Sequence, residues 1–318
     1  MRKLPFVSIV IPCTSTNDCS RECVSRCKEL DYANYEIILL PDEAPEESDG
    51  IKIVPTGPVT PGAKRNIGIS NSIGEICAFI DSDAYPRKDW LKNAVKYFED
   101  SDVAAVGGPG LTPEEDSFMQ KASGFVLSSF MVGNLSRRYK SDCFVESDDI
   151  HSCNFTARKS VLLETGGWNE RYWPGEDTLI CREMRRLGGK LIEAPDVIVF
   201  HHRRPLFKEH LKQVSSYGLH RGYFAKKFKG NSLRSLYFLP SFLVTFLFAG
   251  GVLSFFNSLT FSGFLSLMIV YTILCIVASL FEVKGSKLAL VVLLGTFLTH
   301  ISYGFSFIIG LVKRDLQR

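Results

Sequence analysis

The sequence predicts an α/β fold, a mostly parallel sheet with helices on both faces, followed by C-terminal transmembrane helices. Three observations lead to this prediction. Short apolar runs alternate with helix-length segments over the first part of the 318-residue chain, as in βαβ units. The runs are continuously apolar, as expected for strands that are covered on both faces. Two long stretches near the end of the chain carry no charged side chain.

The predicted elements follow one another in a regular order. The expected strands are residues 6–12, 35–41, 51–54, 75–81, 103–106, 152–157, 190–194 and 197–201. The expected helices are residues 18–30, 61–72, 87–98, 158–165 and 177–187, then a long basic helix or pair of helices over 205–227. Because ligands bind at the carboxyl ends of strands in such sheets, the residues that follow the strands are the first candidates for a site.

The uncharged stretches predict a membrane anchor. Residues 235–281 and 288–312 contain no Asp, Glu, Lys or Arg. A helix that crosses a bilayer needs about 20 apolar residues, so the first stretch accommodates two spans (about 236–256 and 261–281) and the second accommodates one. Three spans would put the two ends of this anchor on opposite sides, although Lys313 and Arg314 favour the inside. The last segment is therefore expected either to span the membrane or to lie re-entrant or in the interface.

Charge divides the chain into three parts. Residues 1–202 carry 23 basic and 31 acidic side chains, whereas residues 203–234 carry nine basic and one acidic. We therefore expect a globular domain over 1–202, a basic juxtamembrane neck over 203–234 and a membrane domain over 235–318. The neck favours the cytoplasmic leaflet, which predicts a multi-pass protein of the inner (cytoplasmic) membrane with a cytosolic globular domain. The net charge of +3 disfavours a dedicated nucleic-acid binder.

Acidic residues follow a predicted strand at Asp81 and Asp83. Two carboxylates at this spacing leave the sheet in a turn, where they can hold Mg²⁺ or Mn²⁺ and a diphosphate. The alternative is a solvated turn. Lys64 and Arg65, near the start of the preceding helix, can hold an anion, and their alternative is an ordinary exposed helix start.

Two further candidates lie in the second half of the globular domain. Asp177 opens a helix after an aromatic turn, and the aromatic residues would raise its basicity as a general base. Its alternative is the acidic residue that helix N-termini favour. His201 and His202 end the last strand, and one of them, with His201 favoured, is expected to bind the metal. The alternative is a structural histidine.

Taken together, these motifs resemble family 2 glycosyltransferases of the GT-A fold over about residues 5–225. The matching segments are Val7-Ser-Ile-Val-Ile-Pro12, Ala63-Lys-Arg-Asn66, Asp81-Ser-Asp83, Cys153-Asn-Phe-Thr-Ala-Arg158, Gly166-Gly-Trp-Asn169, Gly175-Glu-Asp177 and His201. The neck and tail resemble the membrane-anchored exopolysaccharide branch, which includes succinoglycan-type enzymes.

The resemblance implies roles for individual residues. Asp177 is the expected catalytic base, and a divalent metal, Mg²⁺ or Mn²⁺, is expected on Asp83, Asp81 and His201. The residues expected to bind the nucleotide sugar are Pro12, Thr14, Asp42, Lys64, Arg65, Asp81, Asn154 and Glu176. Those expected near the acceptor are Trp173, His202, Gln213, Tyr217 and Arg221. Residues 41–45 depart from the Asp-Asp-Gly-Ser turn of many relatives, which leaves the nucleotide open.

The function implied is inverting, metal-dependent transfer of a sugar from a nucleotide diphosphate sugar to a hydroxyl of a lipid-linked glycan. One alternative is transfer of a single sugar to polyprenyl phosphate. An inactive membrane scaffold is an alternative of another class. A transporter subunit is disfavoured because the predicted spans contain no Asp, Glu, Lys or Arg, and His300 is their one histidine. The sequence specifies neither the sugar, the nucleotide and the acceptor nor the oligomeric state.

Overall fold

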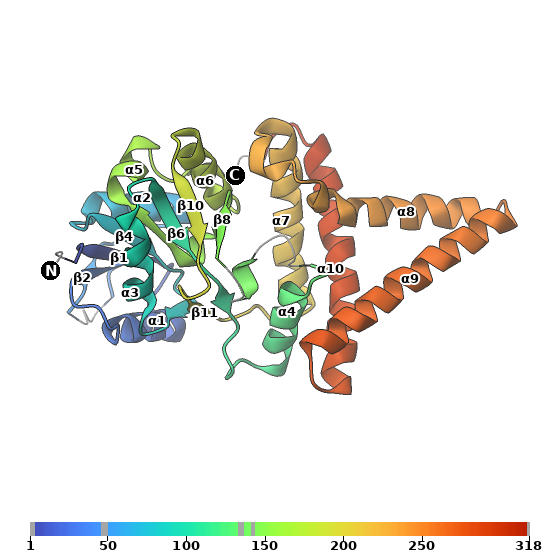
Figure 1. Cartoon of the computed structure of the whole chain (residues 1–318), viewed down its shortest axis with the longest axis horizontal. Coiled ribbons are helices and arrows are strands. Elements are labelled where there is room, and N and C mark those ends of the chain that lie inside the picture. Colours follow the sequence, from blue (N-terminus) through green and yellow to red (C-terminus); the bar gives the residue numbers. More distant parts are fainter. Residues whose placement is uncertain (1–3, 46–49, 133–136, 141–143, 317–318) are drawn as a thin grey trace. The chain divides into compact units, whose positions relative to one another are not determined.

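The computed structural model describes residues 4–45, 50–132, 137–140 and 144–316. The chain forms two compact units, coloured along the sequence in Figure 1. The first unit comprises Met1–Pro113 and Lys140–His202, and the second comprises Glu114–Tyr139 and Arg203–Leu316. Residues 114–139 therefore belong with the C-terminal part of the chain, whereas the sequence predicts one globular domain over 1–202.

An eight-stranded sheet forms the centre of the first unit, in the order β3-β2-β1-β4-β9-β6-β10-β8. Strands β9 and β8 run antiparallel to their neighbours, and the other pairs are parallel. The strands are β1 (Val7–Pro12), β2 (Tyr35–Leu40), β3 (Lys52–Ile53), β4 (Ile76–Phe79), β6 (Val103–Gly107), β8 (Val145–Ser147), β9 (Phe155–Arg158) and β10 (Lys190–Glu193). This mixed α/β sheet confirms the predicted fold class.

Both faces of the sheet are covered by apolar packing. Alternate residues of β1 illustrate this, because Ile9 and Ile11 belong to one core cluster and Val10 belongs to another. Every residue of β1, β4 and β6 is buried, which explains why these strands are continuously apolar. The accompanying helices are α1 (Asp18–Lys28), α2 (Pro61–Asn71), α3 (Trp90–Val95), α5 (Lys159–Glu164) and α6 (Glu176–Arg186).

A second, three-stranded sheet was not predicted. It consists of β5 (Ala84–Pro86), β11 (Val199–His201) and β7 (Gly110–Leu111), with β11 in the middle. Two predicted elements also differ from the structure. The expected strand over 152–157 begins as a 3₁₀ turn, Ser152–Asn154, and the expected helix over 87–98 ends as a 3₁₀ turn, Lys96–Glu99.

The second unit is helical in its described residues. Its main helices are α4 (Phe118–Ser128), α7 (Lys208–Lys227), α8 (Leu239–Ser254), α9 (Ser258–Glu282) and α10 (Ser286–Val312). Short 3₁₀ turns lie at Arg137–Tyr139, Gly230–Ser232 and Ser235–Phe238. Helix α4 was not predicted, and the basic neck forms one long helix, α7. Three segments of the described chain are long and apolar enough to cross a membrane: Ser235–Ser254, Ser258–Glu282 and Ser286–Val312.

Candidate active site

The turn after β4 brings Asp81 and Asp83 to His201. Strands β5 and β11 pair so that His201 lies opposite Ala84, the residue after Asp83. The backbone N–H of His202 also donates to the carbonyl of Asp83 at 3.0 Å. This ladder explains why His201 Nε2 lies 3.2 Å from Asp83 Oδ1 although the two residues are far apart in the sequence.

The three side chains form a group with the composition of a metal site. One ligand atom each from Asp81, Asp83 and His201 lies within 4.8 Å of the others. Carboxylate oxygens suit Mg²⁺ and Mn²⁺, and an imidazole nitrogen suits Mn²⁺ and other transition ions. The donor set therefore fits the divalent cation expected from the sequence. Strand β5, which was not predicted, and strand β11, which lies within the expected strand 197–201, are the elements that position it.

Two residues that the sequence analysis assigned no role lie behind His201. The Cys153 sulfur is 3.1 Å from His151 Nδ1, and His151 Nε2 is 2.8 Å from the carbonyl of Gly108. Burial opposes ionisation of Cys153, but His151 and His201 outweigh it and lower the pKa of the thiol to about 6. Burial likewise disfavours the imidazolium of His201, yet Asp83 and Cys153 raise its pKa well above the usual value.

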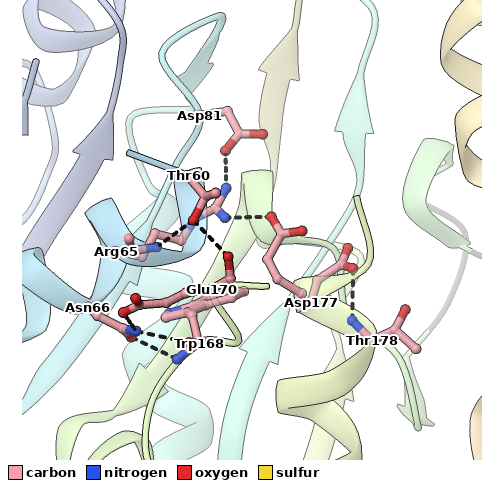
Figure 2. A network of polar contacts seen from close by, with 10 residues as sticks. Thr60, Arg65, Asn66, Asp81, Trp168, Glu170, Asp177 and Thr178 are labelled. Carbon is pink, nitrogen blue, oxygen red and sulfur yellow. Dashed lines mark hydrogen bonds and ion pairs between the residues drawn. The ribbon is translucent and has the colours of Figure 1, made fainter. Parts of the chain in front are cut away.

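Arg65 on α2 joins the turn after β4 to the start of α6. Its guanidinium donates to Asp81 Oδ1 at 2.8 Å and to Glu176 Oε1 at 2.7 Å. The side chain is buried, and its Cζ lies 4.8 Å from the centre of the Trp168 ring. One planar cation thus fixes the separation between the two acidic segments. Figure 2 shows Arg65 between Asp81 and the segment that carries Asp177.

Asn66, the next residue of α2, holds the loop that leads to α6. Its amide nitrogen donates to the Trp168 carbonyl at 2.9 Å and to Glu170 Oε1 at 2.8 Å, and its oxygen accepts from the Trp168 N–H at 2.7 Å. Thr60 caps α2 and donates to the Glu170 carbonyl at 3.2 Å. The segment around residue 65 is therefore a buried clamp rather than the exposed helix start weighed as its alternative.

Lys64 binds the residue that follows β2. Its ammonium lies 2.6 Å from Asp42 Oδ1, 2.5 Å from Thr56 Oγ1 and 3.3 Å from the Leu40 carbonyl. The lysine is buried, whereas the Asp42 carboxylate remains 27% exposed. Lys64 is thus engaged with protein oxygens, and it positions Asp42 at the carboxyl end of β2.

The first turn of α6 presents two carboxylates with different surroundings. Gly175 precedes the helix at φ 111°, a left-handed conformation that favours glycine. Burial raises the pKa of Glu176 to about 7, aided by the charge of Asp177 and opposed by Arg65. Asp177 is half-buried and accepts the backbone N–H of Thr178 at 2.8 Å. In the part of the chain that the structure describes, Asp177 makes no ion pair.

Asn154 is buried and hydrogen-bonded to other parts of the protein, and its expected contact with the nucleotide sugar stays a prediction. Its side chain is fully buried, accepts from Trp90 Nε1 at 2.8 Å and donates to the carbonyls of Val197 and Pro109. These bonds tie β9 to the loops before β7 and β11. Asn154 therefore supports the site from behind.

The remaining candidates of the first unit are spread around the strand ends. Pro12 is buried at the end of β1, and Thr14 is exposed, with its carbonyl accepting the Asp42 N–H. Trp173 is 38% exposed. His202 points to α1, where its Nε2 lies 3.0 Å from Glu22, so it does not join the group around Asp83.

Gln213, Tyr217 and Arg221 lie on α7 in the second unit. Arg221 stacks on Tyr237, with its Cζ 4.6 Å from the ring centre, and Tyr217 is 39% exposed. Their expected contact with the acceptor stays a prediction.

Fold and site together define the class of protein. A mixed sheet that presents an Asp-Ser-Asp turn and a helix-start carboxylate at its strand ends is the arrangement of a GT-A glycosyltransferase. Residues 8–163 match the sequence model of glycosyl transferase family 2. The chain belongs to this family and is a glycosyltransferase, so the alternatives of an inactive scaffold and a transporter subunit fall away.

Known relatives resemble the chain over much of its length. It is 22% identical to a dolichyl N-acetyl-alpha-D-glucosaminyl phosphate 3-beta-D-2,3-diacetamido-2,3-dideoxy-beta-D-glucuronosyltransferase from Methanococcus voltae, over 97% of this chain and 98% of that protein. It is 25% identical to glycosyltransferase AglE from Haloferax volcanii, over 66% of this chain and 71% of that protein.

A solved structure shares the fold. The mannosyltransferase PcManGT from Pyrobaculum calidifontis, in complex with GDP-Man and Mn²⁺, aligns with a TM-score of 0.66 and 16% identity. The alignment covers 99% of this chain and 89% of that protein. This similarity confirms the GT-A fold.

Proposed function

We propose that this protein transfers a sugar from a nucleotide diphosphate sugar to a hydroxyl of a lipid-linked glycan, with inversion at the anomeric carbon. The observation that carries the proposal is the bridge made by Arg65. The Arg65 guanidinium binds Asp81 in the Asp81–Asp83 turn and Glu176 at the start of α6. The turn therefore lies close to Asp177, the next residue of α6. A donor held at the turn thus lies beside a carboxylate that can accept a proton.

Asp81, Asp83 and His201 would hold the divalent metal, with Mg²⁺ or Mn²⁺ as the ion. The metal, when bound, offsets the negative charge that develops on the departing diphosphate. The mannosyltransferase from Pyrobaculum calidifontis, which shares the fold, holds Mn²⁺ together with a nucleotide sugar. Cys153 and His151 would orient the imidazole of His201 from the side away from the metal.

Asp42 would contact the nucleoside of the donor. It lies at the carboxyl end of β2, where the sheet binds ligands, and Lys64 fixes its carboxylate at 2.6 Å. The backbone carbonyl of the exposed Thr14 accepts the N–H of Asp42. Lys64 and Arg65 themselves are buried on protein carboxylates, so they would act by positioning Asp42, Asp81 and Glu176.

Asp177 would remove the proton from the acceptor hydroxyl as that oxygen attacks the anomeric carbon. The attack comes from the face opposite the diphosphate, which inverts the configuration. One carboxylate suffices for this role, since the diphosphate leaves without protonation by a second carboxyl group. Glu176 is a poorer candidate because it is 3% exposed and bonded to Arg65.

The apolar helices and one relative support a lipid-linked glycan as the acceptor. The protein from Methanococcus voltae is named for action on a dolichyl phosphate-linked sugar. An anchor in the cytoplasmic membrane, with the first unit in the cytosol, would place the site where such acceptors present their sugars. Basic side chains of α7 are suited to anionic lipid at that surface.

The experiment is a donor and acceptor screen with the full chain in lipid nanodiscs, Mn²⁺ and UDP-, GDP- and dTDP-sugars. We expect one donor to give a labelled product with a polyprenyl-linked saccharide and much less product with the free saccharide. Product from bare polyprenyl phosphate would favour the alternative of direct transfer to the lipid phosphate. Equal turnover of free and lipid-linked saccharides would contradict the assigned acceptor.

A further inference from the structure

Helices α7 and α10 of the second unit lie backbone against backbone. A Cβ added to Gly218 would be 2.4 Å from the Tyr303 carbonyl oxygen, and one added to Gly222 would be 2.1 Å from that of Phe307. On the other helix, a Cβ at Gly310 would be 2.1 Å from the Leu219 carbonyl oxygen. Contacts this close leave no room for lipid between the two helices.

The contact continues along the whole of α7. At its start, His210 Nε2 lies 2.8 Å from Thr299 Oγ1, and at its end Lys226 Nζ bonds the Lys313 carbonyl. Residue numbers rise together on both helices, so the helices run parallel. With 20 residues, α7 is about 30 Å long, which is the thickness of a bilayer's hydrocarbon core. Figure 1 shows the two helices side by side.

Charge prevents α7 from crossing a bilayer. Five charged side chains of this helix are exposed: Lys208, Glu209, Lys212, Lys226 and Lys227. The interior of α7 also contains Arg221, two serines, a glutamine and a histidine, and placing such groups in hydrocarbon is costly. Helix α7 is not among the described helices that are long and apolar enough to cross a membrane. Because α10 is packed along α7, it cannot cross the bilayer unless α7 crosses with it.

Helix α10 instead has one exposed apolar face. This face is formed by four large apolar side chains whose spacing keeps them on one side of the helix. They are Leu290 (66% exposed), Leu294 (49%), Phe305 (59%) and Val312 (73%). The protein buries 39% of the most apolar 18-residue stretch of α10, compared with 6% for the segment that contains α8 and 17% for α9. A one-sided apolar face beside basic residues is typical of a helix in the membrane interface.

We propose that this protein enters the bilayer through α8 and α9 only, and that α10 lies along the membrane surface with α7 beside it. The partner of this surface is an anionic lipid bilayer. The apolar face of α10 contacts the acyl boundary, and the lysines of α7 contact headgroups. Both ends of α10 then lie on the same side of the membrane as α7. The basic residues near these ends therefore all face the cytoplasmic leaflet, as the positive-inside rule predicts: Lys284, Lys287, Lys313 and Arg314. This topology goes beyond the proposed enzymatic function.

The test is cysteine labelling of the full chain in sealed membrane vesicles of both orientations. Cys19, which is exposed, and Cys143 are first replaced by Ser. Single cysteines are then introduced by Lys212→Cys on α7, Phe256→Cys at the α8–α9 tip, Lys287→Cys at the α10 start and Arg314→Cys after α10. A membrane-impermeant maleimide reports the side on which each position lies.

We expect Lys212→Cys and Arg314→Cys to react from the same side. Lys287→Cys is the matched control, because it shares the side of position 212 whether or not α10 spans. Reaction of position 314 from the opposite side alone would overturn the proposal. Protection of position 256, or its reaction from the opposite side, supports the hairpin. Its reaction from the side of position 212 would overturn membrane insertion itself, an outcome separate from any failure of glycosyl transfer.

Discussion

Arg65 shows how one side chain can define the geometry of this site. Its two terminal nitrogens bind carboxylates from a strand end and from a helix start, and Trp168 covers the plane of the guanidinium. Lysine, which carries its charge at a single point, cannot reproduce this fork. Loss of one partner leaves a buried carboxylate without its cation, and that is costly in a low-dielectric environment.

Arg65→Lys should therefore reduce both stability and turnover. We expect the free energy of unfolding of the first unit to fall by about 3 kcal/mol, within the range found when a buried ion pair is broken. Turnover should fall further than the stability loss explains, since Asp81 and the α6 start lose their fixed separation. Thermal melting and transfer rates of the full chain in detergent measure both effects.

Glu176→Gln is the matched control for that variant. The pKa of Glu176, which burial raises to about 7, means that this position tolerates a neutral side chain better than Arg65 tolerates loss of its fork. The amide oxygen can still accept from Arg65. A Glu176→Gln variant that melts lower than Arg65→Lys would contradict the view that the guanidinium organises the site.

At this scale the sequence predicted which residues gather but not how each is used. Asp81, Asp83 and His201 were expected together and lie together. Lys64 and Arg65 were expected to face a ligand, yet both are buried on protein carboxylates. That difference could not be foreseen because the partners come from other strands and helices. Cys153 was part of a motif, but its interaction with His201 depends on where the pairing of β11 places that histidine.

At the scale of elements, long apolar runs were predicted well and short pairings were not. The strands around residues 7–12 and 35–40 have enough buried, β-branched residues to be recognised. Strands β5 and β7 have three and two residues and no apolar run of their own. These two strands form because their backbones pair with β11. The sequence therefore contains no local sign of β5, which sets the position of the Asp83 turn. Helix α4 escaped prediction because its moderate apolar face packs against distant helices.

His210 on α7 makes the stability of the second unit depend on pH. It is fully buried between Ser123 of α4 and Thr299 of α10, with both hydroxyls at 2.8 Å, and burial lowers its pKa to about 4. The unfolded chain binds this proton near pH 6.5, so stability is complete above that value and falls towards pH 4. The change in pKa from 6.5 in the unfolded chain to about 4 in the folded chain corresponds to about 3 kcal/mol of stability in total.

His210→Gln retains hydrogen-bonding groups at this position and removes the titration. We expect the melting temperature of the wild-type chain in detergent to fall more than that of His210→Gln when the pH is lowered from 7 to 5. Other ionisable groups titrate equally in both proteins, so the difference isolates His210. Parallel melting curves at the two pH values would exclude this histidine as the cause.

At the scale of the whole molecule, sequence order and spatial grouping differ. Charge and hydropathy indicated successive segments along the chain, whereas residues 114–139 leave the first unit and pack with 203–316. Val126 of α4 illustrates the reason, because it lies 2.9 Å from the position of a Cβ at Gly295 of α10. A contact between helices so distant in sequence leaves no local signal. The sequence did predict the three apolar segments and the α/β fold.

The central claim is that the metal-binding turn and Asp177 act on one bound nucleotide sugar. The most direct measurement compares Asp177→Asn with Asp83→Asn for Mn²⁺-dependent donor binding by calorimetry and for transfer. Asp177→Asn should bind donor as the wild-type chain does, with turnover reduced by about 1,000-fold, as for loss of a general base. Asp83→Asn should lose Mn²⁺-dependent donor binding. Near-normal turnover by Asp177→Asn, or unchanged donor binding by Asp83→Asn, would contradict this account.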